Sequence, residues 1–496
     1  MDVLFDGLSI LARWDVVAAL LIGSVGGVII GAIPGVGAAV AIAILLPATF
    51  SFDPIVGLTV LLGIYGSSMY GGSIPAILIN TPGTAVNALT TYDGYPMTRR
   101  GEGRRALSLA YSASFFGGIF SVLCLIVLSP LLAAIAPHFG SREIFLAALL
   151  GLVLAVVVHR GQTVIAAFLV FFGIFINTIG LHTATLTRRF TFELNFLASG
   201  IDLIVVVLGL FALSQAFVLL VARDDSPKAA PVSGGLFQGL GELFKFPGTA
   251  SASSGFGVVM GMIPGVGEFM AQFLSYTFAQ RRSKTPEKFG DGAPEGLIAS
   301  EAANNAVPGA AMIPLLALGV PGEALTAMML SVFYVHNVVP GPQLFQNQMD
   351  FVMALYLALL ILNVMVLIFL LFSTNTLLQV IRIPTRFLGV MILTLAFVGV
   401  YSLRNSVWDC AIAAVFGFIG FVLKRLQLPI VPIILGMVLG RIMEVKLRAS
   451  MARVKTPLDF IDRPIAFILF CAIVIIIVMH IRTQLKSRKT ETNQNA

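Results

Sequence analysis

Residues 27–37 read Gly-Val-Ile-Ile-Gly-Ala-Ile-Pro-Gly-Val-Gly, and residues 257–267 read Gly-Val-Val-Met-Gly-Met-Ile-Pro-Gly-Val-Gly. The two stretches are identical at eight of eleven positions and lie 230 residues apart (257 − 27). Proline cannot donate a backbone hydrogen bond and glycine relaxes the backbone, so each Pro-Gly-Val-Gly predicts a break between helices. A duplicated break in long apolar sequence is typical of transporters built from two repeats, whose substrate site lies where broken helices meet.

The composition places these breaks in a membrane protein. Of the 496 residues, 58% are hydrophobic and 11% are charged, whereas a soluble domain carries about 25% charged residues. A membrane-spanning helix needs about 20 apolar residues. With the broken segments included, we expect an all-α polytopic membrane protein with about 10–12 transmembrane helices. The clearest apolar segments are 106–136, 143–158, 162–181, 200–221, 351–373, 387–403, 408–423 and 464–481.

A second duplicated motif follows each break. Residues 73–85 and 312–324 agree at five of thirteen positions, and Pro75 and Pro314 lie 239 residues apart (314 − 75). The near-equal offset indicates that each half carries a Pro-Gly-x-Gly break and then a Pro-x6-Pro-Gly break. The predicted organisation is a first repeat half (1–221), a linker (222–250), a second repeat half (251–481) and a cytoplasmic tail (482–496).

The charged loops predict that the two halves face opposite ways. Positively charged loops lie on the cytoplasmic side of a membrane. Between its two motifs the first half has no Lys or Arg, whereas the second half has Arg281, Arg282, Lys284 and Lys288. After the second motif the pattern reverses, because Arg99, Arg100, Arg104 and Arg105 belong to the first half. Equivalent loops therefore lie on opposite sides, which predicts inverted structural repeats with broken or re-entrant Pro-Gly segments.

The breaks themselves are the predicted substrate site. A helix that begins after a break points free N–H groups and the positive end of its dipole at the gap, which favours an anion. Irregular backbone at membrane depth is tolerated where it lines a wet cavity. The predicted substrate-binding residues are those at the four tips: Pro34, Gly35, Val36 and Gly37; Asn80, Thr81, Pro82, Gly83 and Thr84; Pro264, Gly265, Val266 and Gly267; and Val320, Pro321, Gly322 and Glu323.

Cation coupling is expected because the tips lack positive side chains. No Lys or Arg occurs from Trp14 to Thr98 or from Phe289 to Ile381. An acid inside a membrane is a functional hypothesis by default, as a cation ligand or a proton carrier. The alternative is a carboxylate at a helix start that free N–H groups satisfy. The candidate coupling residues are Asn80, Thr84, Glu268, Glu301, Asn304, Asn305 and Glu323.

One further pattern concerns helix packing. The Gly-x3-Gly pairs Gly27–Gly31 and Gly257–Gly261 are typical of close helix contacts.

Other classes of function are not supported by the sequence. No GxSxG, P-loop, HExxH or metal-ligand spacing of Cys or His occurs, so we expect no enzyme, no catalytic residue and no resident metal or organic cofactor. The net charge of +7 lies in short loops and at the C-terminus, which indicates membrane orientation and no nucleic-acid partner.

The full motif set resembles the large membrane subunit of tripartite tricarboxylate transporters, the TctA family. The resemblance rests on the duplicated breaks, on Tyr70-Gly71-Gly72-Ser73-Ile74-Pro75 with Asn80-Thr81-Pro82-Gly83, and on Asn304-Asn305 with Gly319-Val320-Pro321-Gly322-Glu323. It implies a multi-pass protein of the bacterial inner membrane that works with a small four-helix membrane subunit and a periplasmic solute-binding protein. It also implies secondary active uptake of a small organic anion such as citrate, usually driven by Na⁺.

The residues leave several alternatives open. They favour neither Na⁺ over H⁺ nor an elevator-like movement over rocking, and they do not fix the carboxylate carried. A stand-alone ion or solute channel is the main alternative function, and a membrane-embedded enzyme is a third.

Overall fold

The structure is a computed structural model that describes residues 2–159, 161–182, 187–222, 237–380, 383–452 and 456–494. Across these residues it is helical apart from loops and one short antiparallel pair, in which β1 (Gly180–Leu181) faces β2 (Arg188–Arg189). Eight helices in this part of the chain are long and apolar enough to cross a membrane, and Gly37–Thr49, Thr163–Thr178 and Ala324–Val335 are shorter apolar helices. The expected all-α polytopic class is confirmed.

The chain forms two compact units, one comprising Met1–Ala134 with Ile204–Arg425 and the other Ile135–Leu203 with Leu426–Ala496. The first unit contains α1 (Asp2–Leu11), α2 (Trp14–Ala32), α3 (Gly37–Thr49), α4 (Pro54–Ile79), η1 (Ala85–Asn87), α5 (Thr90–Arg99), α6 (Gly103–Ile135), α9 (Leu203–Val207), the π-helix η4 (Leu208–Leu213), α10 (Ser214–Val221), η5 (Leu240–Lys245), α11 (Pro247–Met262), α12 (Gly267–Arg282), η6 (Pro286–Lys288), α13 (Pro294–Leu318), α14 (Ala324–Val335), α15 (Pro342–Asn347), α16 (Met349–Val380), α17 (Thr385–Arg404) and α18 (Val407–Arg425).

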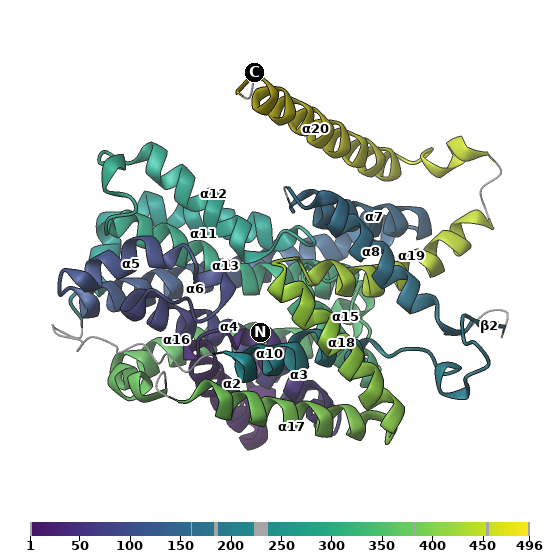
Figure 1. Cartoon of the computed structure of the whole chain (residues 1–496), viewed down its shortest axis with the longest axis horizontal. Helices are drawn as coiled ribbons and strands as arrows, with labels where there is room; N and C mark the ends of the chain where they lie inside the picture. Colours follow the sequence, from purple (N-terminus) through teal and green to yellow (C-terminus); the bar gives the residue numbers. More distant parts are fainter. Residues whose placement is uncertain are drawn as a thin grey trace. The chain divides into compact units, whose positions relative to one another are not determined.

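The second unit is smaller and is built around α19. It contains η2 (Ala136–His138), α7 (Ser141–Val157), α8 (Thr163–Thr178), β1, β2, η3 (Asn195–Leu197), α19 (Val431–Met451), η7 (Pro457–Phe460) and α20 (Pro464–Gln494). A Cβ on Gly436 of α19 would collide with the backbone of Val170 on α8, so these two helices cross closely (Figure 1). Because α7 and α8 come from the predicted first half and α19 from the second, the packing units cut across the predicted halves.

Two equivalent helices form the core of the first unit. α4 is buried from Gly57 to Leu78 and α13 from Gly296 to Ala317. α2 packs along α4, and α11 packs along α13, which is visible for the α11–α13 group in Figure 1. The offset of 239 carries the last residue of α4, Ile79, onto the last residue of α13, Leu318 (79 + 239). The sequence duplication is therefore matched by a duplicated arrangement of helices.

The predicted linker is only partly within the described residues, since 223–236 lie outside them. The part that is described docks on α6. The backbone N–H of Gly239 donates to Ser108 Oγ at 2.8 Å, and Arg105 pairs with Glu242 of η5. Residues 239–245 therefore belong to the packed first unit.

Candidate functional site

Each predicted Pro-Gly-Val-Gly break is a turn between two helices. α2 ends at Ala32 and α3 begins at Gly37, while α11 ends at Met262 and α12 begins at Gly267. The glycines of both turns have matching left-handed φ values, +82° and +63° at Gly35 and Gly37 against +81° and +70° at Gly265 and Gly267. Glycine adopts this conformation without steric cost, which explains why both turns need it.

Within each half, the first break touches the second. The N–H of Gly35 donates to the carbonyl oxygen of Gly83 at 2.9 Å, and the N–H of Gly265 donates to that of Gly322 at 2.8 Å. The structure thus brings predicted tip residues together in two equivalent pairs.

The second breaks are also built alike. Asn80 caps the end of α4 and Gly319 caps the end of α13, and both residues are left-handed, with φ of 54° and 68°. In the first half, the N–H of Thr81 donates to the carbonyl oxygen of Pro75 at 3.3 Å. In the second half, the N–H of Val320 donates to that of Pro314, also at 3.3 Å. Asparagine is the residue other than glycine that most readily takes this conformation, so Asn80 serves here as a helix cap. The side chain of Asn80 is exposed, whereas Gly83 and Thr84 are buried.

After each cap the chain turns back along the helix it has just left. The N–H of Gly83 donates to the carbonyl of Gly72 at 3.2 Å, seven residues before the end of α4, or about 10 Å along the axis. A Cβ on Gly322 would lie 3.5 Å from Ala311, the equivalent position on α13. α5 and α14 then lead the chain onward. The segments after both second breaks therefore dip back toward the middle of α4 and α13.

The glycine pairs before the breaks serve close packing. A Cβ on Gly27 would lie 2.7 Å from Cα of Ile64, and one on Gly31 would lie 2.8 Å from Cα of Ser68. A Cβ on Gly261 would lie 3.0 Å from the carbonyl of Val307. These contacts let α2 reach α4, and α11 reach α13, at backbone distance. The packing interpretation of the Gly-x3-Gly spacing is confirmed.

Glu301, inside α13, accepts hydrogen bonds from side chains of three other helices. Its carboxylate accepts hydrogen bonds from Ser73 (2.8 Å), Thr90 (2.5 Å) and Ser114 (2.8 Å). It is fully buried and lies seven residues after the start of α13, Pro294 (301 − 294), so the helix-start interpretation is wrong for it. Its oxygens instead join α4, α5 and α6 to α13.

The other candidate coupling residues differ in how their polar atoms are satisfied. The Nδ2 group of Asn305 donates to Ser114 Oγ at 2.8 Å, and Thr84 donates to Asn87. Glu268 and Glu323 both lie at helix starts, and the N–H of Glu323 donates to Thr326 Oγ1 at 3.0 Å. Among the described residues, one oxygen of each of these two acids and both amide atoms of Asn304 have no hydrogen-bond partner.

Comparison with known proteins identifies the family of the chain. The sequence model of the tripartite tricarboxylate transporter TctA family matches residues 17–435. The chain belongs to the TctA family. It is similar to an uncharacterized 52.8 kDa protein in the TAR-I ttuC' 3' region of Agrobacterium vitis, with 33% identity over 96% of this chain and 94% of the relative. An uncharacterized protein in the TAR-II ttuC' 3' region of the same organism is 31% identical over 47% of this chain and 98% of the relative. No solved structure matches.

One polar contact of this TctA-family protein was missed by the sequence analysis. Asp93 of α5 is fully buried and accepts hydrogen bonds from the N–H groups of Gly290, Gly292 and Ala293 at 2.8–2.9 Å and from the Tyr276 hydroxyl at 2.8 Å. It thereby ties the segment after the first half's second break to α12 and to the loop before α13. An acid in a stretch without Lys or Arg was the available signal, and Asp93 lies in such a stretch.

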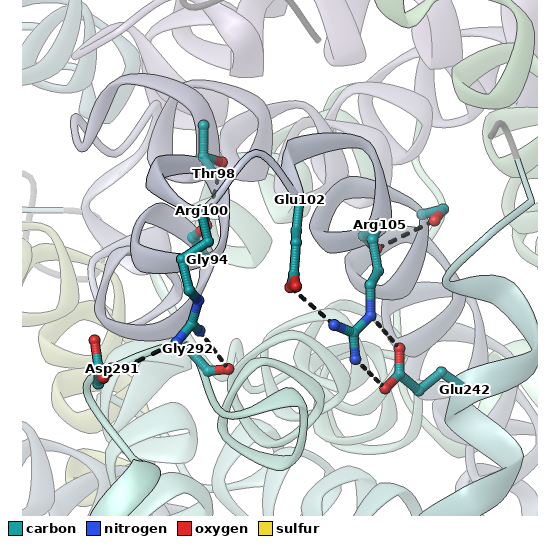
Figure 2. Close-up of polar contacts among 9 residues, drawn as sticks. Gly94, Thr98, Arg100, Glu102, Arg105, Glu242, Asp291 and Gly292 are labelled. Carbon is teal, nitrogen blue, oxygen red and sulfur yellow. Dashed lines mark hydrogen bonds and ion pairs between the residues drawn. The ribbon is translucent and has the colours of Figure 1, made fainter. Parts of the chain in front are cut away.

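Arg100 and Arg105, which follow α5 in this TctA-family chain, form ion pairs with acidic residues. Figure 2 shows Arg100 reaching toward Asp291 and Gly292, with its guanidinium 3.9 Å from the Asp291 carboxylate and 3.2 Å from the Gly292 carbonyl. It also shows Arg105 between Glu102 and Glu242. The first half's loop after its second motif thus meets the second half's loop between motifs.

The reciprocal pair of loops also meets. His336, which follows the second motif of the second half, lies 3.3 Å from the carbonyl of Thr49, which lies between the motifs of the first half. A Cβ on Gly57 would lie 3.7 Å from Val332 of α14. Each loop of one half therefore contacts the non-equivalent loop of the other.

Proposed function

We propose that this chain is the large permease subunit of a tripartite carboxylate transporter. It takes up a small organic anion by secondary active transport in the bacterial inner membrane. A tricarboxylate is the first cargo to test. A periplasmic solute-binding protein delivers the anion, a small four-helix membrane subunit completes the complex, and Na⁺ supplies the energy.

The observation that carries the proposal is the pair of bonds from Gly35 to Gly83 and from Gly265 to Gly322, in a chain of the TctA family. Broken helices that meet inside a transporter provide N–H groups for an anion and carbonyl groups for a cation. The four tips, from Pro34 to Gly37, Asn80 to Thr84, Pro264 to Gly267 and Val320 to Glu323, are the proposed substrate site.

Inverted repeats are the proposed architecture, and the loop contacts support them. If the halves were parallel, a loop between motifs would share its side with the same loop of the other half. Instead, Arg100 contacts the loop that ends at Gly292, and His336 contacts Thr49. The end that carries Arg99, Arg100, Arg104, Arg105, Arg281, Arg282, Lys284 and Lys288 is the proposed cytoplasmic end.

The proposed mechanism is alternating access. The anion enters from the periplasmic side, binds among the tips together with Na⁺, and is released after one part of the protein moves. Because no Lys or Arg lies between Trp14 and Thr98 or between Phe289 and Ile381, the cation provides the positive charge that a buried carboxylate requires.

Reconstituted uptake tests the proposal. The chain is placed in proteoliposomes with the small membrane subunit, and labelled citrate, other tricarboxylates, dicarboxylates and aromatic acids are offered with and without the solute-binding protein and a Na⁺ gradient. We expect accumulation of at least one acid that needs both additions. Passive flux without either addition would instead identify a channel, and conversion of an acid into another compound would identify an enzyme.

A further inference from the structure

One face of α12 carries polar residues one helical turn apart. Glu268, Gln272 and Tyr276 are spaced i, i+4 and i+8, so they form one stripe. On α13, Gly296, Ser300 and Asn304 have the same spacing. α12 and α13 pack against each other. They run antiparallel, because Tyr276 lies near Gly296 whereas the earlier residue Ser275 lies near the later residue Ala299.

Two contacts fix the register between these stripes. The ring of Tyr276 lies 3.0 Å from the position that a Cβ on Gly296 would take, and Ser275 Oγ donates to the carbonyl of Ala299 at 2.9 Å. Glu268 lies eight residues before Tyr276 on α12, and Asn304 lies eight residues after Gly296 on α13. Each step is about 12 Å along its helix. Because the two helices run in opposite directions, Glu268 lies level with Asn304. Gln272 lies between these two levels and faces the same side.

The side chains of Glu268, Gln272 and Asn304 are buried and lack hydrogen-bond partners for some or all of their polar atoms. Gln272 and Asn304 are 0% exposed and Glu268 is 8% exposed. Within the described part of the chain, both amide atoms of Gln272, both of Asn304 and one carboxylate oxygen of Glu268 have no hydrogen-bond partner. Burying a polar atom without a partner is unfavourable. Three of these five atoms are oxygens, one on each side chain, and oxygens of this kind are the ligands that a hard cation binds.

The equivalent place in the first half has no acid or amide. The offset of 230 carries Glu268 and Gln272 onto Ala38 and Ile42 of α3, and the offset of 239 carries Asn304 onto Tyr65 of α4 (304 − 239). The carboxylate and the two amides therefore belong to the second half alone, and helix packing common to both halves does not explain them.

The surroundings favour a cation. The neighbouring acids are already satisfied, since Asp93 accepts three N–H groups and the Tyr276 hydroxyl, and Glu301 accepts three hydroxyl groups. The nearest basic residues of α12, Arg281 and Arg282, lie at its far end, at least 13 residues from Glu268 (281 − 268), or about 20 Å. A carboxylate without a positive partner repels a second carboxylate, whereas carboxylate and amide oxygens bind hard cations.

We propose that Glu268, Gln272 and Asn304 form a cation site that holds the Na⁺ that drives uptake. The inference rests on the proposed Na⁺ coupling and adds Gln272 as a ligand. η1, which follows the first half's second break, packs against both α12 and α13. Binding of the cation is thereby linked to the position of a substrate tip.

The test measures Na⁺ binding without transport. The purified full-length chain in detergent is heated in NaCl at increasing concentration, with choline chloride holding the ionic strength constant. A ligand that binds the folded protein raises the unfolding midpoint as its concentration rises. For the wild type we expect a rise that saturates with Na⁺ and is absent with choline.

Variants separate a ligand from a packing role. Gln272→Leu removes the unsatisfied amide, so its midpoint in choline should be equal to or higher than that of the wild type. Its half-saturating Na⁺ concentration should rise at least about tenfold, the order expected when a bond to a charged group is lost. Gln272→Glu keeps an oxygen ligand and should still respond to Na⁺. Tyr65→Phe is the matched control, because Tyr65 is also fully buried with no partner for its hydroxyl among the described residues, and its response should stay within about twofold of the wild type.

Two results would overturn the inference, and they are distinguishable. If Gln272→Leu and Asn304→Leu respond to Na⁺ as the wild type does, the site is wrong while Na⁺ coupling stands. If the wild type itself shows no response to Na⁺, both this site and the Na⁺ coupling in the proposed function fall.

Discussion

Gly31 and Gly83 approach each other so closely that a Cβ on Gly83 would overlap the carbonyl oxygen of Gly31. The same Cβ would lie 2.7 Å from Cα of Gly72. The tip of the first half's second break therefore lies tightly between α2 and α4. Position 83 has space for the hydrogen of glycine but not for a side chain. The second half is looser, since the nearest atom to a Cβ on Gly322 is the carbonyl oxygen of Gly261 at 2.8 Å.

This difference predicts graded effects at the two tips. Gly83→Ala should abolish uptake, because backbone atoms on both sides leave no way to accommodate the methyl group. Gly322→Ala should reduce uptake less, and the leucine variants at both sites should abolish it while the protein still inserts in the membrane. Uptake in proteoliposomes, normalised to inserted protein, measures the series. Normal uptake by both leucine variants would remove these residues from the site.

The neighbours Gly26 and Gly27 offer a matched pair on α2. A Cβ on Gly26 meets nothing within 4 Å, whereas one on Gly27 would lie 2.7 Å from Cα of Ile64. Gly26→Ala should be neutral or stabilise the protein by up to about 1 kcal/mol through helix propensity. Gly27→Ala should destabilise it by about 1–3 kcal/mol, the usual cost of overpacking. Thermal unfolding midpoints of the two variants, compared in one detergent, decide the matter; equal midpoints would contradict the close crossing of α2 and α4.

The buried carboxylate of Asp93 accepts four hydrogen bonds. We therefore expect its replacement to destabilise the protein even when the size of the side chain is kept. Asp93→Asn keeps the size of the side chain and one acceptor oxygen, but it removes the negative charge that the N–H groups of Gly290, Gly292 and Ala293 face and replaces the second oxygen with an amide group. We expect a loss of about 2–4 kcal/mol, because bonds to a charged acceptor are the stronger ones. Tyr276→Phe removes a single bond and should cost about 1–2 kcal/mol.

A double-mutant cycle of Asp93→Asn and Tyr276→Phe checks this assignment by thermal unfolding. Effects of residues in contact are not additive, so the double variant should lose less than the sum of the single variants. Strict additivity would show that the two side chains do not share a bond in the folded protein.

Glu301 predicts a different outcome from Glu268. Three hydroxyl groups already satisfy the Glu301 carboxylate, so Glu301→Gln should lower the unfolding midpoint while the half-saturating Na⁺ concentration stays within about twofold of that of the wild type. The same thermal titration measures both quantities. A loss of the Na⁺ response with an unchanged midpoint would instead make Glu301 a cation ligand.

Much of the fold follows from local sequence. Helices break at Pro34-Gly35 and Pro264-Gly265 because of backbone chemistry that two residues determine, and the duplication marks both sites. The packing role of Gly27 and Gly31 is likewise visible in their spacing. Each of the eight clearest apolar segments contains a helix. Six of them, all but 143–158 and 162–181, coincide with a helix long and apolar enough to span a membrane.

Contacts between distant residues could not be predicted in this way. The bond from Gly35 to Gly83 joins two breaks that are 48 residues apart (83 − 35), and nothing local specifies it. The sequence does not reveal that α7 and α8 pack with α19, because apolar helix faces are interchangeable until their small residues are matched in space. Asp93 and Gln272 escaped notice since their partners, or the lack of them, arise only when α5, α12 and α13 come together.

The central claim is that the chain consists of two inverted halves, each with two tips that meet, and the side of the membrane on which the loops lie tests it. Cys124, Cys410 and Cys471 are replaced by alanine, and single cysteines are placed at the exposed positions Arg100, Lys284, Asp53 and Asn347. A membrane-impermeant maleimide should label the cysteines at Arg100 and Lys284 only from the cytoplasmic side, and those at Asp53 and Asn347 only from the periplasmic side. Labelling of Arg100→Cys and Lys284→Cys from opposite sides would contradict the account.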